Sequence, residues 1–143
     1  MNRHLFLVAA LAALSGYVSA APRPERTCFH SMEQLEKDIG FCQAVRSGNT
    51  LHVSGVAAGG TMDSAIRSVY ERLGDVLKAN GLSVANVVRE TVFATDLDAF
   101  IANKAIRHEF YGTSLPAASW VQVQRLYLPS YVLEVELTAE FEE

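Results

Sequence analysis

The chain has 143 residues, which is enough for one domain and too few for two. Half of the residues are hydrophobic and 20% are charged, a composition that excludes intrinsic disorder. The formal net charge of -4 disfavours nucleic acid as the main partner, because phosphate binding depends on clustered Lys and Arg. The two cysteines are too few for a disulfide-dense scaffold or a multi-cysteine zinc site.

The first twenty residues have the layout of a signal peptide. Arg3 and His4 give a positive start, residues 5–14 form an apolar run, and Val18-Ser19-Ala20 is typical of a cleavage site. The run is well short of the roughly 20 apolar residues that a membrane-spanning helix needs. We therefore expect residues 1–20 to be removed on export to a periplasm or out of the cell, with no membrane contact afterwards. Residues 21–26 are then a leader, and residues 27–143 form the domain.

Export also affects the interpretation of Cys28 and Cys42, because oxidising compartments favour disulfides. If the two cysteines lie on paired strands, a disulfide between them is geometrically possible. The alternative is two buried free thiols. We expect the disulfide, and the distance that decides between the two cannot be obtained from the sequence.

The first half of the domain is predicted to contain three short strands and one long helix. The strands are expected near residues 27–30, 42–46 and 51–54, the last two joined by the turn residues 47–50. Residues 32–37 are interpreted as a charged connection, and residues 55–60 as a flexible segment. Residues 62–80 form the clearest helix, with an apolar stripe at three- and four-residue steps made by Met62, Ile66, Val69, Leu73, Val76 and Leu77.

The second half is predicted to contain three strands and one helix. Residues 87–95 are β-branched and apolar, residues 96–111 form a helix, and a strand is expected around residues 120–126. Residues 132–141 alternate between apolar and polar side chains. The order β-β-β-α-β-α-β-β predicts an α+β two-layer sandwich, in which two helices cover one face of a mixed six-stranded sheet. The strands are apolar on more than one face, which favours an oligomer formed over the open face.

Three segments carry a combined motif pattern. Residues 40–55 run from Gly-Phe-Cys-Gln-Ala-Val to Ser-Gly, residues 86–100 contain the Thr-Asp-Leu-Asp-Ala-Phe junction, and residues 116–126 begin with Pro-Ala-Ala-Ser and precede the Leu-Glu-Val-Glu of residues 133–136. In this order and spacing the chain resembles the Rid family (reactive intermediate deaminases, also called YjgF-like) over residues 27–141. The resemblance implies the chorismate-mutase-like fold and a homotrimer with small-molecule clefts between subunits.

The resemblance also implies a chemistry, the hydrolysis of an imine or enamine to a 2-oxo acid and ammonia. In the family an Arg of the Pro-Ala-Arg motif grips the substrate carboxylate, and a Glu positions water; here these positions are Ala118 and Glu134. The family's aromatic hydroxyl position is Phe41, and its cleft Asn aligns with Lys104. No metal or other cofactor is implied. The remaining residues expected at the cleft are Gly55, Ser119 and Trp120.

Several of these residues have a plainer interpretation. Glu134 could belong to a solvated strand face, Lys104 to a solvated helix face, and Trp120 to a buried trimer core. Ser54 has no recognisable His and Asp partners for a hydrolase triad. Three histidines show no metal-ligand spacing and are expected in the core or on the surface: His30, His52 and His108.

Three functions remain on this reasoning. The first is an exported Rid-type enzyme that hydrolyses an imine or a related C–N compound with reduced activity. The second is a non-catalytic trimer that binds a small metabolite or a partner in its clefts. The third, the endoribonuclease activity of some family members, is disfavoured by the acidic charge and by export. Because Ala118 cannot bind a carboxylate, we expect poor deamination of 2-iminobutanoate and 2-iminopropanoate.

Overall fold

The computed structural model describes residues 25–142, so the predicted signal peptide and most of the predicted leader lie outside the described residues. The strands are β1 (Arg26–Phe29), β2 (Ala44–Ser47), β3 (Thr50–Gly59), β4 (Val87–Ala94), β5 (Ala117–Gln122) and β6 (Tyr131–Glu140). The helices are α1 (Glu33–Ile39), α2 (Met62–Ala79), α3 (Leu97–Ala102) and α4 (Lys104–Tyr111), with a 3-10 turn η1 (Val84–Asn86). Within this part of the chain, no helix is both long and apolar enough to cross a membrane.

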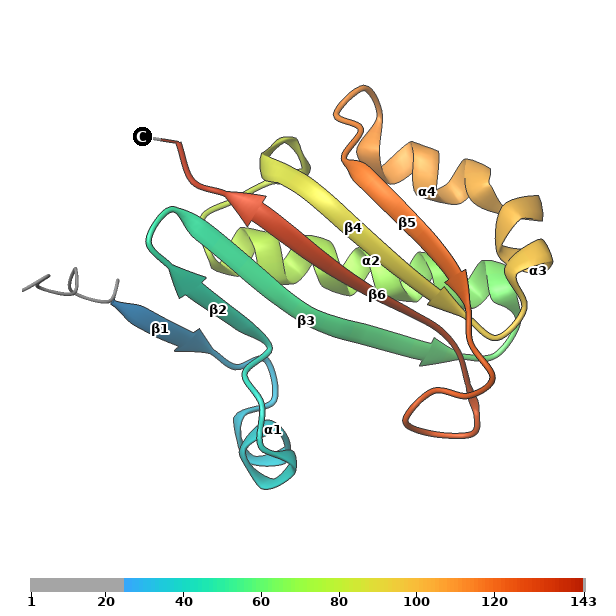
Figure 1. The fold of residues 1–143 in the computed structure, drawn as a ribbon, viewed down its shortest axis with the longest axis horizontal. Coiled ribbons are helices and arrows are strands. Elements are labelled where there is room, and N and C mark those ends of the chain that lie inside the picture. The colour runs from blue at the N-terminus through green and yellow to red at the C-terminus, as the bar shows by residue number, and fades with distance from the viewer. Residues whose placement is uncertain (1–24, 143) are drawn as a thin grey trace, which may run out of the picture.

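The six strands form one mixed sheet in the order β1-β2-β3-β6-β4-β5 (Figure 1). Only the pairing of β4 with β5 is parallel, because α3 and α4 form the crossover between them; the other described pairs are antiparallel. The predicted α+β two-layer fold with a mixed six-stranded sheet is confirmed. The strand order along the sheet places β1 and β5 at opposite edges.

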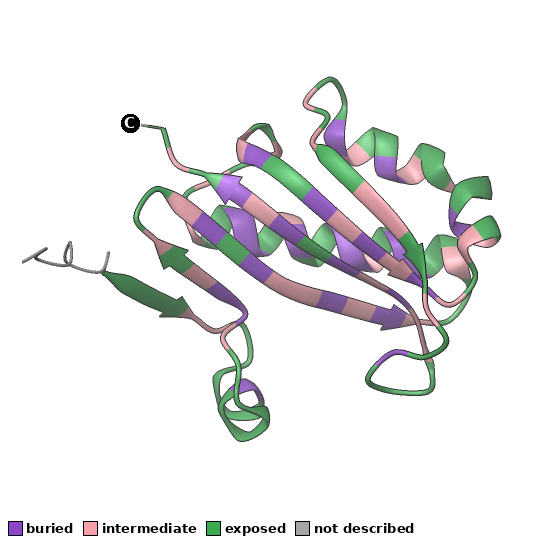
Figure 2. Cartoon of the chain, in the orientation of Figure 1, coloured by how far each residue is buried: buried purple, intermediate pink, exposed green. Residues whose placement is uncertain are grey.

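The helices α2, α3 and α4 lie on one face of the sheet, and the core is between the two layers (Figure 1). The predicted apolar stripe of α2 is confirmed for Ile66, Val69 and Leu73, which are fully buried. On β6 every second side chain faces the helices, which gives the alternating burial seen in Figure 2. The buried members of β6 are Leu133, Val135, Leu137 and Ala139.

The predicted charged connection at residues 32–37 is wrong, because this segment begins helix α1. The Glu36 carboxylate accepts hydrogen bonds from the backbone N–H groups of Ser31 (3.0 Å) and Met32 (2.7 Å), so it stabilises the start of the helix from within. Gly40, in the left-handed conformation with φ 96°, ends it. The helix shows no apolar stripe in the sequence because most of its side chains are exposed.

Three other boundaries differ from the prediction. The helix expected over residues 96–111 is divided at Asn103, whose side-chain amide donates to the Ala99 carbonyl and ends α3. The segment expected to be flexible is not a loop, because residues 55–59 belong to β3, which has a register shift between Val53 and Val56. The strand expected around residues 120–126 ends at Gln122.

The sheet face opposite the helices is more polar than the sequence led us to expect. Strand alternation places apolar Val45, Ala57, Phe93, Val121 and Val132 on this open face, together with His52, Arg89, Thr91, Glu134, Glu136 and Thr138. Only part of this surface is therefore suited to burial in an apolar contact.

Candidate active site

The centre of the candidate site is the approach of Glu134 on β6 to Gly55 on β3. Gly55 lies within the register shift of β3, and Glu134 pairs with Ala57 of the same strand. A Cβ atom added at Gly55 would overlap the Glu134 carboxylate and lie 2.7 Å from its Cδ atom. The absence of a side chain at position 55 is therefore what allows the carboxylate to lie there. The structure brings these two predicted site residues together.

The Glu134 carboxyl group is half-buried on the open face. Burial raises its pKa above the ordinary value, and the negative charge of Glu136 raises the pKa further. On β4 the residue paired with Glu134 is Phe93, which adds an apolar neighbour. A carboxyl group with a raised pKa can exchange protons with water closer to neutral pH, as a general acid or base must do.

A set of hydrogen bonds joins Ser54, the residue before Gly55, to the segment that carries Phe41. The Ser54 hydroxyl donates to the Cys42 carbonyl at 2.7 Å, and the Gln43 side-chain amide donates to the Ser54 carbonyl at 3.1 Å. The Phe41 backbone N–H donates to the Glu36 carbonyl at 3.0 Å, while the Phe41 side chain is 36% exposed. This segment is therefore fixed against β3, and the ring of Phe41 is available at the surface.

Three other predicted site residues do not lie beside Glu134: Ala118, Trp120 and Lys104. Ala118 and Trp120 on β5 are paired with Glu90 and Val92, which are buried under the helices, so both face the helix layer. Lys104 is the exposed first residue of α4. In one chain the sheet therefore separates these residues from the carboxylate of Glu134.

Ser119 and Trp120 point to opposite faces of β5. The Ser119 hydroxyl accepts a hydrogen bond from Arg89 at 3.0 Å on the open face. The Trp120 ring packs edge-on against Phe100, with ring centroids 5.1 Å apart, and its indole N–H donates to Glu90 at 3.3 Å. Trp120 is thus held against the core of its own subunit.

A buried charged cluster lies under α2 and α4 and was not predicted from the sequence. The Glu90 carboxylate is 0% exposed and accepts hydrogen bonds from the hydroxyls of Tyr70 (2.6 Å) and Tyr111 (2.9 Å) and from Arg107 Nε (2.7 Å). Burial, and then the charge of Glu90, raises the pKa of both tyrosines. A signal was present, because Glu90 is the charged residue on the otherwise apolar, helix-facing side of β4, where a charge requires a buried partner.

Arg107 lies over two of the aromatic rings in this cluster. Its guanidinium is 4.7 Å from the ring centroid of Tyr111 and 5.2 Å from that of Trp120. The guanidinium of Arg107 already pairs with the Glu90 carboxylate. Arg107 therefore does not take over the role of the carboxylate-binding Arg whose motif position is Ala118 in this chain.

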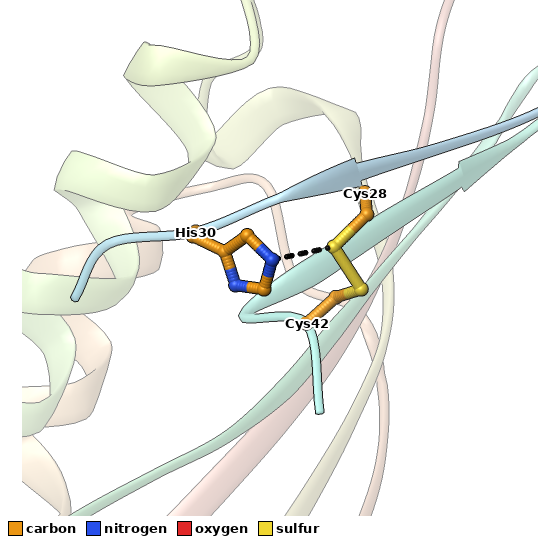
Figure 3. A group of neighbouring side chains, drawn as sticks. All are labelled: Cys28, His30 and Cys42. Atoms are coloured by element: carbon orange, nitrogen blue, oxygen red, sulfur yellow. Dashed lines mark hydrogen bonds between the residues drawn. A yellow bond between two sulfur atoms is a disulfide. The ribbon is translucent and has the colours of Figure 1, made fainter. Parts of the chain in front are cut away.

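Cys28 and Cys42 are joined by a disulfide, with Cα atoms 5.6 Å apart. The bond connects β1 to the segment between α1 and β2, and His30 lies beside it (Figure 3). His30 Nε2 is 3.1 Å from Cys28 Sγ. In the disulfide state neither sulfur is a thiolate, so this group is not a metal site.

Comparison with known proteins identifies the family. The family model described as Endoribonuclease L-PSP matches residues 31–141. The chain belongs to this family. A RutC family protein of Pyrococcus horikoshii is 33% identical over 119 residues, covering 75% of this chain and 92% of the relative. The 2-iminobutanoate/2-iminopropanoate deaminase of Mus musculus is 32% identical, covering 69% and 79%.

Solved structures agree with the family assignment. The crystal structure of a YjgF/YER057c/UK114 family member from Mycobacterium tuberculosis has a TM-score of 0.75 and 27% identity, and it covers 82% of this chain and 100% of that one. The chain therefore has the YjgF-type fold.

Proposed function

We propose that this protein hydrolyses small imines or enamines, with Glu134 positioning and deprotonating the attacking water. The observation that carries the proposal is the half-buried Glu134 carboxyl group lying over Gly55. Relatives named as 2-iminobutanoate/2-iminopropanoate deaminases support the reaction class. Water adds to the carbon of the C=N bond while one of its protons passes to Glu134. Glu134 passes this proton to the nitrogen, which gives a carbinolamine. Glu134 then moves the remaining hydroxyl proton to the nitrogen as the C–N bond breaks, which releases a carbonyl product and ammonia.

The proposed substrates are imines without a carboxylate. Ala118 offers no donor and no charge where the related deaminase motif has an Arg, and Phe41 offers no hydroxyl. Leaving a ligand charge unpaired in a desolvated site costs about 2–5 kcal/mol. Activity on 2-iminobutanoate and 2-iminopropanoate is therefore reduced, by roughly 30-fold to several thousandfold.

The site is proposed to be completed between subunits of a homotrimer. In one chain Ala118 and Trp120 lie on the opposite side of the sheet from Glu134, so they cannot contact the same ligand there. A second copy that places its β5 edge beside Gly55 and Glu134 would bring both groups to one cleft. Light scattering of the purified protein should give about three times the chain mass; a monomer at micromolar concentration would contradict this part of the proposal.

Export is the proposed location, as the first twenty residues indicate. The Cys28–Cys42 disulfide supports it, since such bonds persist in oxidising compartments. Fractionation of the native host should place the processed chain outside the cytoplasm. Unprocessed protein in the cytoplasm would contradict the proposal.

A second candidate function is small-molecule binding without catalysis. It is favoured by the two missing polar groups at positions 41 and 118. An RNA substrate is disfavoured because Glu134 and Glu136 make the centre of the open face acidic.

Hydrolysis assays separate the two candidates. The imines are generated in place, carboxylated ones by an amino-acid oxidase or dehydratase and neutral ones by an amine oxidase, and ammonia release is followed with and without the protein. Acceleration for neutral imines is the expected result, and no acceleration for either class would favour binding alone. The Ala118→Arg variant should gain activity on the carboxylated imines, since Glu134 and Gly55 are unchanged.

A further inference from the structure

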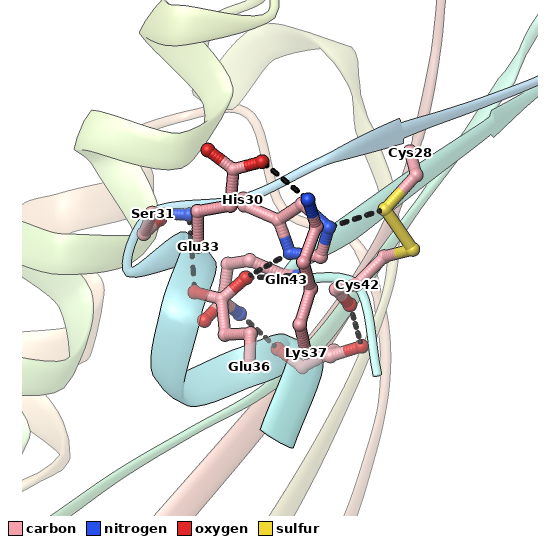
Figure 4. Close-up of a disulfide and its surroundings, with 9 residues drawn as sticks. Cys28, His30, Ser31, Glu33, Glu36, Lys37, Cys42 and Gln43 are labelled. Carbon is pink, nitrogen blue, oxygen red and sulfur yellow. Dashed lines mark hydrogen bonds and ion pairs between the residues drawn. A yellow bond between two sulfur atoms is a disulfide. The ribbon is translucent and has the colours of Figure 1, made fainter. Parts of the chain in front are cut away.

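A chain of polar contacts surrounds the Cys28–Cys42 disulfide, outside the proposed imine site. Cys28 Sγ is 3.1 Å from His30 Nε2, and His30 Nδ1 is 2.7 Å from Glu36 Oε2 (Figure 4). Sulfur, imidazole and carboxylate therefore follow one another within hydrogen-bond distance. This is the order in which cysteine nucleophiles, their bases and the groups that orient those bases are arranged.

We propose that the Cys28–Cys42 disulfide is redox-active, and that the reduced form holds Cys28 as a thiolate paired with the His30 imidazolium for exchange with small thiols and disulfides. This activity is independent of the imine chemistry. It does not require Glu134, Gly55 or contact between subunits.

Glu36 is the residue that makes the ion pair favourable. Its side chain is 1% exposed, and besides His30 it accepts hydrogen bonds from the backbone N–H groups of Ser31 (3.0 Å), Met32 (2.7 Å) and Gln43 (3.3 Å). Burial alone would raise its pKa, but these hydrogen bonds together hold the pKa below the ordinary value. The carboxylate therefore stays ionised where His30 Nδ1 contacts it at 2.7 Å.

The other charged neighbours do not cancel this effect. Lys37 and Glu33 pair with each other at 2.6 Å on the exposed side of α1, so their charges offset one another. On β2 the residue paired with Cys28 is the uncharged Val45. His30 and Glu36 thus determine the electrostatics at the sulfur.

The disulfide is also accessible. Strand β1 is the edge of the sheet, and Cys28 is exposed on it, whereas Cys42 and His30 are only partly buried. A small thiol can therefore reach the sulfur atoms without unfolding of the core.

The reaction balances with a low-molecular-weight thiol as reductant. The thiolate of the first thiol attacks Cys42 Sγ, the Sγ–Sγ bond breaks, and the electron pair leaves on Cys28 Sγ next to His30. A second thiol attacks the mixed disulfide, releasing Cys42 as a thiol and the reductant as its own disulfide. Two electrons and two protons pass to the protein, one proton residing in the Cys28–His30 pair and one on Cys42.

The test compares His30→Ala with His108→Ala, an exposed histidine on α4, in glutathione redox buffers. If the ion pair stabilises the reduced form, His30→Ala shifts the equilibrium about tenfold towards the disulfide and slows alkylation of Cys28 about tenfold near pH 6. His108→Ala should match the wild type in both. Glu36→Gln should shift both in the same direction as His30→Ala.

Circular dichroism of each oxidised and reduced protein accompanies these measurements. The proposal is overturned if His30→Ala and wild type alkylate with the same pH profile. It is also overturned if glutathione does not reduce the wild type, or if the reduced wild type is unfolded. If His30→Ala does not fold, the thiolate absorbance of the reduced wild type in the far ultraviolet is measured as a function of pH instead. The proposal predicts thiolate absorbance well below pH 8, and its appearance only above about pH 8, as for an ordinary thiol, overturns the proposal. Imine hydrolysis of the oxidised protein is measured separately, so failure of one proposal does not affect the other.

Discussion

Replacement of Arg107 by Met tests the buried charge cluster between the sheet and α4. Arg107 Nε donates to Glu90 at 2.7 Å, and the Glu90 carboxylate is fully buried. Met keeps an apolar side chain of similar length but removes the donor and the positive charge. The carboxylate then remains in the core with only the neutral hydrogen-bond donors of Tyr70, Tyr111 and Trp120.

The expected loss can be bounded from these contacts. Removing one partner of a buried ion pair costs about 3–5 kcal/mol in free energy of unfolding. Because three neutral donors still solvate Glu90, we expect the lower end, about 3 kcal/mol. This is a large part of the roughly 5–15 kcal/mol that stabilises an ordinary domain.

Urea unfolding at a fixed protein concentration measures the effect. The matched control is Arg67→Met, whose partner Glu109 is 3.9 Å away and exposed, so little change is expected. The double variant combines Glu90→Gln with Arg107→Met and leaves no uncompensated charge in the core. Its loss in free energy of unfolding should therefore be smaller than the sum of the losses in the two single variants. A loss below about 1 kcal/mol for Arg107→Met, or simple additivity, would refute the reasoning.

Three further outcomes follow from the structure. Gly55→Ala should displace the Glu134 carboxylate and abolish imine hydrolysis. The control is Gly74→Ala in α2, where the added Cβ meets only an ordinary contact at 3.5 Å. This variant should keep its activity and gain about 0.5–1 kcal/mol in free energy of unfolding. Because the pKa of Glu134 is raised in the folded protein, the wild type loses folding stability as pH rises above 4.5. In urea titrations, Glu134→Gln should therefore be more stable than the wild type at neutral pH and equally stable at lower pH. Because the pKa of Glu36 is lowered, Glu36→Gln should be less stable than wild type at neutral pH, and the difference should shrink as pH falls below 4.5; a constant difference would contradict the sign.

The sequence predicted the elements whose burial follows a regular period. Helix α2 and strand β6 each bury one face, and their boundaries match the expected ones closely. Helix α1 was missed because it buries almost nothing and is stabilised through the single side chain of Glu36, a local effect without periodicity. The break at Asn103 was missed for the same reason, since one amide hydrogen bond ends α3.

The candidate site was predictable only in part. The family motifs identified Glu134 and Gly55, which the structure brings together. They also grouped Ala118 and Trp120 with these residues, although strand pairing puts them on the other face of the sheet. Sequence motifs group residues by their order along the chain and do not report which face of the sheet each side chain occupies. The Glu90–Arg107 pair joins β4 to α4 and depends on a packing contact that no local pattern encodes.

The role of Glu134 is tested most directly by the rate of neutral-imine hydrolysis in Glu134→Gln. The matched control is Glu140→Gln, an exposed position at the end of the same strand. Loss of a general base should lower the rate by about a hundredfold or more in Glu134→Gln and leave Glu140→Gln at the wild-type rate. Equal rates in the wild type and Glu134→Gln would contradict the proposal that this carboxylate activates water.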